Sequence, residues 1–186
     1  MLPAQLVDRL ATLVAGDAWL MTVLKIARGL NLPDWAVGAG AVRNFVWDQL
    51  SAKPTRTKPA DIDVLYFDPR DCDPARETAY EAALARQADL VWQVRNQARM
   101  HLRNGDPPYR DTEDALRYWL ETPTCVAVRL EGDGHLTVIA PHGLDDLFAL
   151  ALRPTPQGRR RLAAYRARLA SKDWTNQWPR LTIDHG

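Results

Sequence analysis

The 186-residue sequence predicts an α/β (α+β) fold, in which helices and short strands follow one another along the chain. Apolar residues recur at helical spacing near the amino terminus, β-rich runs bounded by Gly, Pro or Asp follow, and an Asp-Gly turn separates two such runs. Hydrophobic residues make up 46% of the chain and charged residues 25%, the balance of a globular domain. We expect one domain over 1–186, with N-terminal helices in 1–31, a core in 32–154, and a C-terminal basic helix and tail in 155–186.

Charge and composition narrow the functional classes. The formal net charge of +1 does not favour a nucleic-acid substrate, because proteins that grip a polynucleotide carry a basic excess. No apolar stretch approaches the roughly 20 residues of a membrane-spanning helix, and Asp8 and Arg9 interrupt any secretory signal. We therefore expect a cytoplasmic protein without a membrane partner. Cys72 and Cys125 lack metal-binding spacing, so structural roles are expected for them.

Two helices are predicted first, from apolar residues at helical spacing over 6–14 and 20–27. Residues 35–39 then form a short apolar run that Gly40 stops. Such a run is typical of a buried strand that ends in a tight turn.

A helix over residues 42–50 follows this turn at once. Arg43 and Asn44 therefore lie in its first turn, near backbone amides that have no partner within the helix. Residues 51–60, with two prolines and three basic side chains, show no periodicity and predict a mobile loop. The β-rich residues 61–67 form the next expected strand.

The remaining elements follow from the same signals. A helix over 74–88 precedes a strand over 90–94, and Thr112 is the expected cap of a later helix. Asp133-Gly134 supplies the turn of a hairpin. The other predicted elements are a helix over 96–102, a helix over 112–120, hairpin strands over 125–130 and 136–140, a helical turn over 143–147, a strand over 148–152 and a helix over 157–170.

Two carboxylates occupy alternate positions of the strand over 61–67. Successive side chains of a strand point to opposite faces, so Asp61 and Asp63 share one face, with Cα atoms roughly 7 Å apart. A hard divalent cation, Mg²⁺ or Mn²⁺, would offset their repulsion and keep positions free for phosphate oxygens. The alternative, in which Asp61 caps the loop and Asp63 pairs with a basic residue, is preferred for an isolated Asp-x-Asp pair.

The strand, Gly turn and helix that precede this pair favour the metal site. A helix amino terminus presents free amides and a positive dipole end to phosphate, and Gly40 would let its backbone approach closely. Arg43 would add a bidentate phosphate contact, and Arg56 or Lys58 could swing over a triphosphate. The predicted nucleotide-binding residues are Gly40, Ala41, Arg43, Asn44 and Lys58.

Four ordered blocks of sequence resemble a bacterial nucleotidyltransferase-like family. The blocks are GAGAVRNFVWD at 38–48, DIDVLYFD at 61–68, NQARMH at 96–101 and APHGLDDLF at 140–148. The resemblance implies a nucleotidyltransferase-type mixed β-sheet flanked by helices. It also implies that Asp61 and Asp63 are the two metal carboxylates and that Gly40 is the small residue of a turn that holds the nucleotide phosphates.

Two departures from the family pattern bear on catalysis. The turn usually contains Gly-Gly or Gly-Ser, whereas Ala41 follows Gly40 here and removes a hydroxyl contact. The third carboxylate is expected between apolar residues of a later strand, where this chain has Gln93, which is neutral and cannot act as a base. The carboxylates that could substitute for it in space are Asp89, Asp145 and Asp146.

Polar residues after Gln93 form a candidate pocket. On a helix, Gln97 and His101 share a face, and so do Asn96 and Arg99. Hydrogen bonding to nearby loops explains these residues equally well. None of the four histidines has zinc-ligand spacing.

Trp47 lies one turn after Arg43 and is the tryptophan that could reach the site. Six arginines gather near the end of the chain, and their favoured interpretation is a solvated helix face. They are Arg153, Arg159, Arg160, Arg161, Arg166 and Arg168.

These residues support three hypotheses. The leading one is metal-dependent transfer of a nucleoside monophosphate from an NTP to a hydroxyl or phosphate acceptor, with Asp61 and Asp63 as catalytic residues. The NTP is expected to be ATP, and the acceptor is an unidentified small molecule or protein. The alternative is a non-catalytic nucleotide-binding or interaction protein, which Gln93 motivates. The third is an RNA-processing factor that would bind the RNA backbone through residues 159–168.

Overall fold

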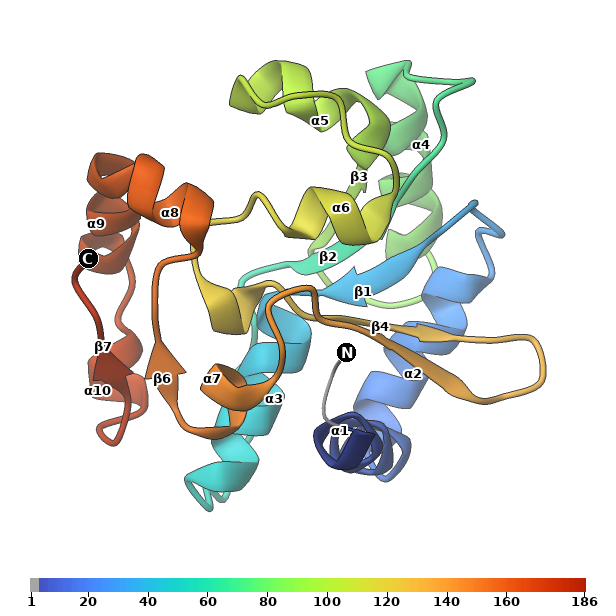
Figure 1. Ribbon diagram of the computed structural model, residues 1–186. Coiled ribbons are helices and arrows are strands. Elements are labelled where there is room, and N and C mark those ends of the chain that lie inside the picture. Colours follow the sequence, from blue (N-terminus) through green and yellow to red (C-terminus); the bar gives the residue numbers. More distant parts are fainter. Residues whose placement is uncertain (1–3) are drawn as a thin grey trace.

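A mixed five-stranded sheet lies at the centre of the computed structural model, which describes residues 4–186 (Figure 1). The strand order is β3-β2-β1-β4-β5. β1 is antiparallel to both β2 and β4, β4 is antiparallel to β5, and β2 is parallel to β3. The predicted α/β class with a mixed, helix-flanked sheet is confirmed. The strands are β1 Ala36–Gly38, β2 Ile62–Tyr66, β3 Trp92–Asn96, β4 Ala127–Leu130 and β5 Leu136–Ile139.

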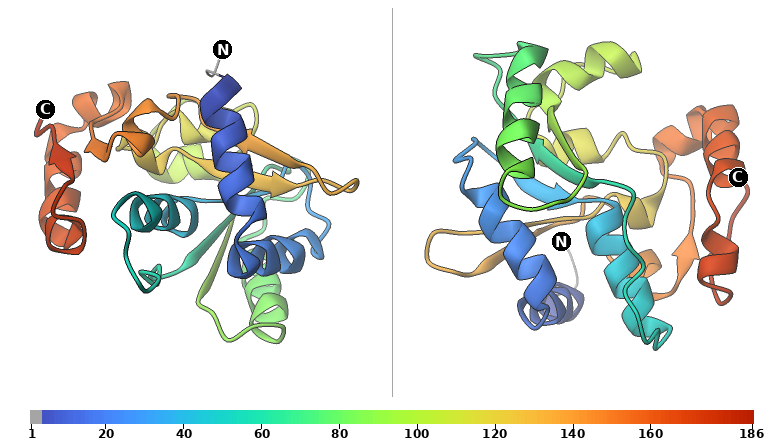
Figure 2. Two further views of the ribbon diagram at one scale, coloured as in Figure 1. Left: turned by 90° about the horizontal axis from the view of Figure 1, so that it is seen from below. Right: turned by 180° about the vertical axis from the view of Figure 1, so that it is seen from behind.

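Four helices build the main core against one face of this sheet. They are α1 Ala4–Ala15, α2 Ala18–Arg28, α3 Gly40–Leu50 and α4 Pro74–Ala85. α2, α3 and α4 lie together on this face in the view from behind (Figure 2). Alternate residues of β2, Ile62, Val64 and Tyr66, are buried in the same cluster as the helix residues. The period of two therefore turns the other side chains of β2 toward the opposite face.

The opposite face has a thinner cover. It carries α5 Gln97–Asn104, α6 Thr112–Leu116 and the 3₁₀ turn η1 Thr122–Thr124 (Figure 1). A small apolar cluster there includes Leu65 of β2 and Leu116 of α6, with Trp119 packed against it. Because this cluster covers only part of the face, the neighbouring side chain of Asp63 lies beside open space.

The C-terminal segment packs along the side of the molecule next to α3. Its elements are α7 Asp145–Phe148, β6 Ala151–Leu152, α8 Pro156–Arg160, α9 Leu162–Ser171, α10 Trp174–Gln177 and β7 Thr182–Ile183, with β6 and β7 parallel. Tyr165, Trp174 and Trp178 are buried, and the Trp178 indole donates to Asp48 of α3 at 2.9 Å. The single basic helix expected over 157–170 is divided into α8 and α9, because Arg161 has a non-helical backbone.

Several expected element boundaries differ from the structure, among them those of β3 and α6. The strand expected over 90–94 is β3, which extends to Asn96, so that Asn96 ends the strand and caps α5. The cap of α6 is Asp111, whose carboxylate accepts from the Asp114 amide at 2.6 Å. Thr112, the expected cap, is buried and donates its hydroxyl to the Asp34 carbonyl at 2.6 Å.

Two later elements are also shorter than expected. The predicted helix over 112–120 ends at Leu116, and only Ala151–Leu152 of the strand expected over 148–152 is extended. Residues before this strand continue α7 to Phe148 instead. The predicted hairpin is confirmed by β4 and β5.

The loop after α3 is anchored, whereas a mobile loop was predicted. The amide and hydroxyl of Thr57 donate to the Asp48 carboxylate at 2.6 and 2.8 Å. Arg56 pairs with Asp17, and its guanidinium lies 4.5 Å from the ring centroid of Trp19. Arg56 is therefore engaged with α2 and does not line the cavities described below.

Within residues 4–186, no single helix is long and apolar enough to cross a membrane. α1 and α2, bent by 91° at their junction, satisfy the length and composition criteria only as a pair. Leu10 and Val14 of α1 and Leu20 and Leu24 of α2 are fully buried in the core of this fold.

Candidate active site

Asp61 and Asp63 are the carboxylate pair of the site. Asp61 immediately precedes β2 and Asp63 lies within it, so strand alternation brings both side chains to the thinly covered face. The Asp61 carboxylate accepts a hydrogen bond from the Gln93 amide at 3.3 Å. No hydrogen bond or ion pair to the Asp63 carboxylate is found within the described residues.

Burial and repulsion act together on Asp63. Removal from water, followed by the neighbouring charge of Asp61, raises the pKa of Asp63 to about 6. The positive charges of Arg168, Arg43 and Arg95 act in the opposite direction. The surroundings therefore do little to stabilise the ionised form of Asp63. A carboxylate of this kind is suited to bind a cation that enters together with a ligand.

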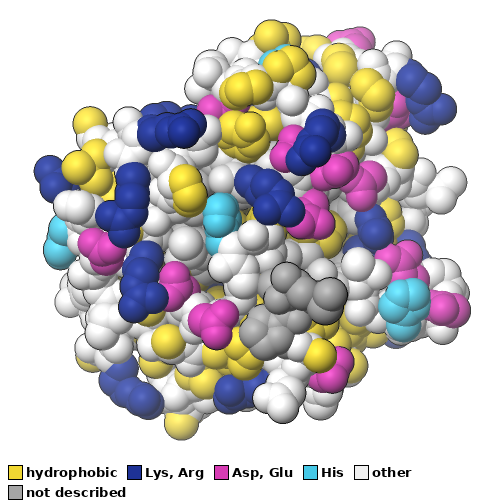
Figure 3. All heavy atoms as spheres, viewed as in Figure 1, with side chains coloured by type: hydrophobic (Ala, Val, Ile, Leu, Met, Phe, Trp, Pro, Cys, Tyr) yellow, Lys and Arg dark blue, Asp and Glu magenta, His cyan; other side chains and the backbone are white. Residues whose placement is uncertain are grey.

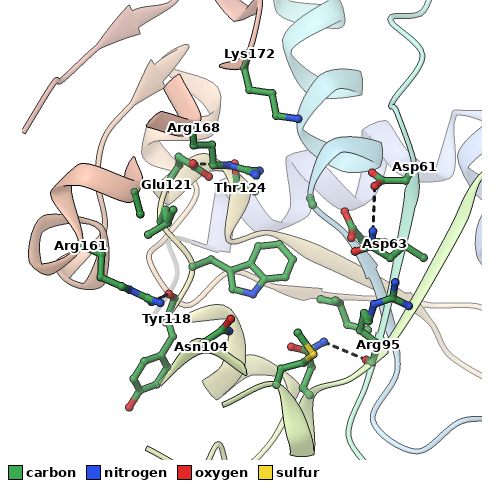
Figure 4. Close-up of a pocket in the computed structure, with 18 residues that line it drawn as sticks. Asp61, Asp63, Arg95, Asn104, Tyr118, Glu121, Thr124, Arg161, Arg168 and Lys172 are labelled. Atoms are coloured by element: carbon green, nitrogen blue, oxygen red, sulfur yellow. Dashed lines mark hydrogen bonds and ion pairs between the residues drawn. The ribbon is translucent and has the colours of Figure 1, made fainter. Parts of the chain in front are cut away.

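The carboxylate pair lies where two cavities meet. One has a volume of about 440 Å³ and extends over β3 and α5, and the other has a volume of about 220 Å³ and extends toward the start of α3. Figure 4 shows the larger cavity, with Asp61 and Asp63 on one wall and Arg161 and Tyr118 at the far end. The residues common to both cavities are Ala39, Asp61, Asp63, Arg168 and Lys172.

Four of the five predicted nucleotide-binding residues line the smaller cavity, namely Gly40, Arg43, Asn44 and Lys58. Ala41 does not, because its side chain is buried in the core, so it can offer only its backbone amide. Arg43 is 5% exposed, and its guanidinium donates to the Thr124 hydroxyl at 2.8 Å and to the Asn44 side-chain oxygen at 2.9 Å. Burial lowers the pKa of Arg43 to about 10, so the group remains a cation at neutral pH.

The tight turn before α3 is shaped by Gly38 and Ala39. Ala39 has the positive φ of the turn, 51°, and its amide donates to the Val126 carbonyl at 2.9 Å. A Cβ added at Gly38 would lie 2.8 Å from the same carbonyl oxygen, so β1 and β4 can approach this closely only with glycine there. A Cβ at Gly40 would make an ordinary contact of 3.5 Å with Pro59. Gly38 is therefore the glycine that strand packing requires in this turn, and the close approach of phosphate at Gly40 stays a prediction.

The four predicted pocket residues are separated by the structure. Gln97 lines the larger cavity, whereas Asn96, Arg99 and His101 line neither cavity. Arg99 pairs with buried Glu77, and the His101 ring packs edge-on against the ring of Tyr109. The predicted helix face does not form because Asn96 belongs to β3 and uses its side chain as a cap.

The position expected for a third carboxylate is occupied by Gln93, which is the register partner of Asp63 on the neighbouring strand. None of the three proposed substitutes lines either cavity: Asp89 and Asp145 are exposed, and Asp146 pairs with Arg153. Residues 4–186 contain no cluster of three or more His, Cys, Asp or Glu side chains that could hold a metal ion. A metal at this site would therefore rely on the carboxylate pair and on its substrate for ligands.

Sequence reasoning missed several residues that line the larger cavity. Glu121 is the buried carboxylate of this cavity, and its Oε1 lies 2.6 Å from Nε of Arg168. The solvated face predicted for the six C-terminal arginines holds for exposed Arg160 and for Arg153, an exposed residue that pairs with Asp146, but the other four differ. Arg159 and Arg166 contact the end of the chain, whereas Arg161 and Arg168 line the cavity. Other missed residues of this cavity include Arg95, Thr124 and Lys172.

Trp47 supports the site from beneath. It is fully buried, its indole donates to the Leu147 carbonyl at 3.1 Å, and its ring lies 5.3 Å from the Arg43 guanidinium. It lines neither cavity and acts through Arg43.

Comparison with known proteins places the chain among the nucleotidyltransferases. A family model described as nucleotidyltransferase matches residues 25–183. An NMR structure described as revealing a CCA-adding enzyme head domain is 30% identical, covers 95% of each chain and superposes with a TM-score of 0.84. The chain belongs to this nucleotidyltransferase family, a class of transferases of phosphorus-containing groups.

Larger solved structures share the fold at low sequence identity. A CCA-adding enzyme solved with CTP is 15% identical with a TM-score of 0.53, and the alignment covers 96% of this chain and 43% of that one. The Thermotoga maritima CCA-adding enzyme complexed with tRNA is 16% identical with a TM-score of 0.51, covering 96% and 42%. This chain thus spans less than half of those enzymes. No curated protein matches the sequence significantly.

Proposed function

We propose that this protein is a metal-dependent nucleotidyltransferase that moves a nucleoside monophosphate from an NTP to a hydroxyl or phosphate acceptor and releases pyrophosphate. The observation that carries the proposal is the position of Asp61 and Asp63 at the junction of two cavities, the smaller of which begins at the amino terminus of α3. Membership of a nucleotidyltransferase family supports the class of reaction.

The donor set of the carboxylate pair fits Mg²⁺ or Mn²⁺. Asp61 receives only an amide hydrogen bond, and Asp63 has no partner within residues 4–186. Two carboxylates supply hard oxygen ligands and leave the other positions of an octahedral ion to water and phosphate oxygens. When bound, the ion would neutralise charge on the reacting phosphate.

The residues around the pair divide the remaining tasks. The free amides of α3, with Arg43 and Lys58, would hold the β- and γ-phosphates in the smaller cavity. The attacking and leaving oxygens lie roughly in line through the transferred phosphorus. Pyrophosphate that leaves on the side of α3 therefore requires an acceptor that enters from the larger cavity.

A nucleotide-binding protein without catalysis is the second candidate, and Gln93 favours it. An amide beside Asp63 provides neither a third metal ligand of negative charge nor a base. This candidate binds an NTP with Mg²⁺ but releases no pyrophosphate.

Pyrophosphate release tests the proposal and separates the two candidates. The protein is incubated with Mg²⁺, with ATP or CTP, and with panels of hydroxylated or phosphorylated small molecules, proteins and tRNA. We expect release with one acceptor class for the wild type and for Asp145→Asn, whose residue is exposed and remote from both cavities. Asp63→Asn should lose this release. Equal rates for wild type and Asp63→Asn would remove the assignment.

A further inference from the structure

Two cations of the C-terminal segment border both cavities. Of the residues that the cavities share, Ala39, Asp61 and Asp63 come from the sheet and its turn, whereas Arg168 comes from α9 and Lys172 follows it. No other Lys or Arg of the described chain lines both. Arg168 and Lys172 lie across the cavity from the carboxylate pair (Figure 4). They therefore face the position at which a metal-bound phosphate would lie.

Arg168 is held in place by a buried partner. Glu121 is 1% exposed, and its Oε1 lies 2.6 Å from Nε of Arg168. The Arg168 guanidinium also lies 5.9 Å from the ring centroid of Trp174. Its two terminal nitrogens make no hydrogen bond within residues 4–186. The ion pair with Glu121 thus orients Arg168 while its terminal nitrogens stay available, and a guanidinium oriented in this way loses less side-chain freedom when it binds phosphate.

A second guanidinium lies close to the first. Arg43 contacts the same Trp174 ring at 4.9 Å, and the charge of Arg168 adds to burial in lowering the pKa of Arg43. The two like charges repel each other, and an anion bound beside them would offset this repulsion. The basic residues that line the smaller cavity are Arg43, Lys58, Arg168 and Lys172.

Three carboxylates also line this cavity, and two of them are the metal candidates Asp61 and Asp63. A divalent cation on that pair would offset both charges. Four cations would then line a cavity of about 220 Å³, opposed only by Asp173 in the same cavity and by Glu121 beside Arg168 among the described residues. A polyphosphate supplies the negative charge that this arrangement lacks. On the surface over α8 and α9, by contrast, Lys and Arg side chains are mixed with acidic ones (Figure 3).

We propose that Arg168 and Lys172 form the second wall of the polyphosphate site, opposite the amino terminus of α3. The ligand class is the β- and γ-phosphates of a nucleoside triphosphate, or pyrophosphate itself. This inference rests on the proposed function, because it concerns the same nucleotide. It makes the C-terminal segment a part of the nucleotide site rather than a solvated extension.

Calorimetric titration with magnesium pyrophosphate, with a nonhydrolysable ATP analogue and with adenosine tests the inference. Arg168→Ala should weaken pyrophosphate and ATP-analogue binding by at least tenfold and leave adenosine binding unchanged. Lys172→Ala should weaken the phosphate ligands by a few fold, because a flexible exposed lysine acts as a point charge. Arg166→Ala is the matched control, since Arg166 lies on the same helix but contacts the chain end.

Loss of Arg168 leaves Glu121 buried without its cation, which could unfold the single variant. A second variant therefore tests the same contact without this buried charge. The double variant Glu121→Gln with Arg168→Gln removes both charges together, so that neither is left buried without its partner. Its melting temperature should stay near that of the wild type, and it should show the same loss of phosphate binding. Wild-type affinity for both phosphate ligands in folded Arg168 variants would overturn the inference. So would an equal loss for adenosine.

Failure of the proposed function gives a different pattern. If the wild type binds neither pyrophosphate nor the ATP analogue, both proposals fall. A second pattern would contradict only the second wall. In it, the wild type binds both ligands and Asp63→Asn loses the Mg²⁺ dependence of binding, but the Arg168 variants bind as tightly as the wild type.

Discussion

Gln93 of β3 is the direct register partner of Asp63 of β2, so a neutral amide lies on the strand beside a carboxylate that has no hydrogen-bond or ion-pair partner in the described part of the chain. The same amide donates to Asp61 at 3.3 Å. Gln93 therefore moderates the repulsion between the two carboxylates while it occupies the place where the family pattern has a third one.

A carboxylate at this position should change metal affinity and stability in opposite directions. Gln93→Glu places three negative charges together, so the metal-free protein should melt at a lower temperature than the wild type. Saturating Mg²⁺ should then raise the melting temperature of the variant more than that of the wild type. Gln87→Glu, at an exposed position, is the control for charge alone. An Mg²⁺ response equal to that of the wild type would separate Gln93 from the metal site.

The raised pKa of Asp63 predicts a pH dependence of stability in the metal-free protein. The folded pKa is about 6, and the ordinary value in the unfolded chain is about 3.9. The neutral carboxyl costs nothing below pH 4, so stability should fall as the pH rises from 4 through 6. The loss is on the order of 2 kcal/mol. Urea unfolding in EDTA measures it, and Asp63→Asn should lack this decline.

Mg²⁺ should stabilise the wild type through the same pair. A ligand that binds only the folded state adds RT ln(1 + [L]/Kd), which is about 2.7 kcal/mol at 100 times Kd. For a chain of this size, that corresponds to a rise in melting temperature of roughly 5–10 °C. Metal-free Asp63→Asn should be at least as stable as the wild type and nearly indifferent to Mg²⁺. A destabilised variant with an intact Mg²⁺ response would make Asp63 a structural residue.

Gly38 should be far less tolerant of substitution than a glycine in open space. In Gly38→Ala the new methyl group would meet the Val126 carbonyl at 2.8 Å and the Ala127 Cβ at 3.0 Å, so β1 and β4 must shift apart. We expect a loss of about 1–3 kcal/mol in the free energy of unfolding, as for other overpacked sites. Gly132→Ala, with no atom within 4 Å of the added methyl, is the matched control. Similar melting temperatures for the two variants would contradict this reading of the turn.

Asn96 should matter for stability but not for nucleotide affinity. Its side chain accepts from the amides of Asp68 and Ala98 and donates to the carbonyls of Asp68 and Asp71. Asn96→Ala leaves these loop groups unpaired and should cost about 2–4 kcal/mol. Binding of the ATP analogue, measured well below the melting temperature, should be unchanged. Weaker binding of the ATP analogue by the folded variant would contradict this prediction and support a role for Asn96 in the pocket.

The sequence was informative wherever a local pattern determines the structure. Strand alternation was sufficient to place Asp61 and Asp63 on one face, and the glycine turn followed by a helix placed Arg43 beside them. The Asp-Gly hairpin followed from turn chemistry. These features depend only on residues that are close together in the chain, so they can be predicted from a single sequence.

Features that depend on distant contacts could not be predicted in this way. Arg168 and Glu121 are 47 positions apart in sequence, and only the packing of the C-terminal segment brings them together. Arg161 breaks the basic helix and donates to the Tyr118 carbonyl, a contact that no periodicity indicates. An asparagine is equally compatible with the end of a strand and with the first turn of a helix. The sequence alone could therefore not distinguish a helix cap at Asn96 from a residue that lines the pocket.

A crystal soaked with Mn²⁺ and a nonhydrolysable NTP tests the central claim most directly, because the anomalous signal of manganese locates the metal independently of the phosphates. We predict a manganese peak bound by the carboxylates of Asp61 and Asp63, with the triphosphate extending from it toward the amino terminus of α3 and Arg43. Manganese bound elsewhere, or a triphosphate that does not contact the metal at this pair, would contradict the account.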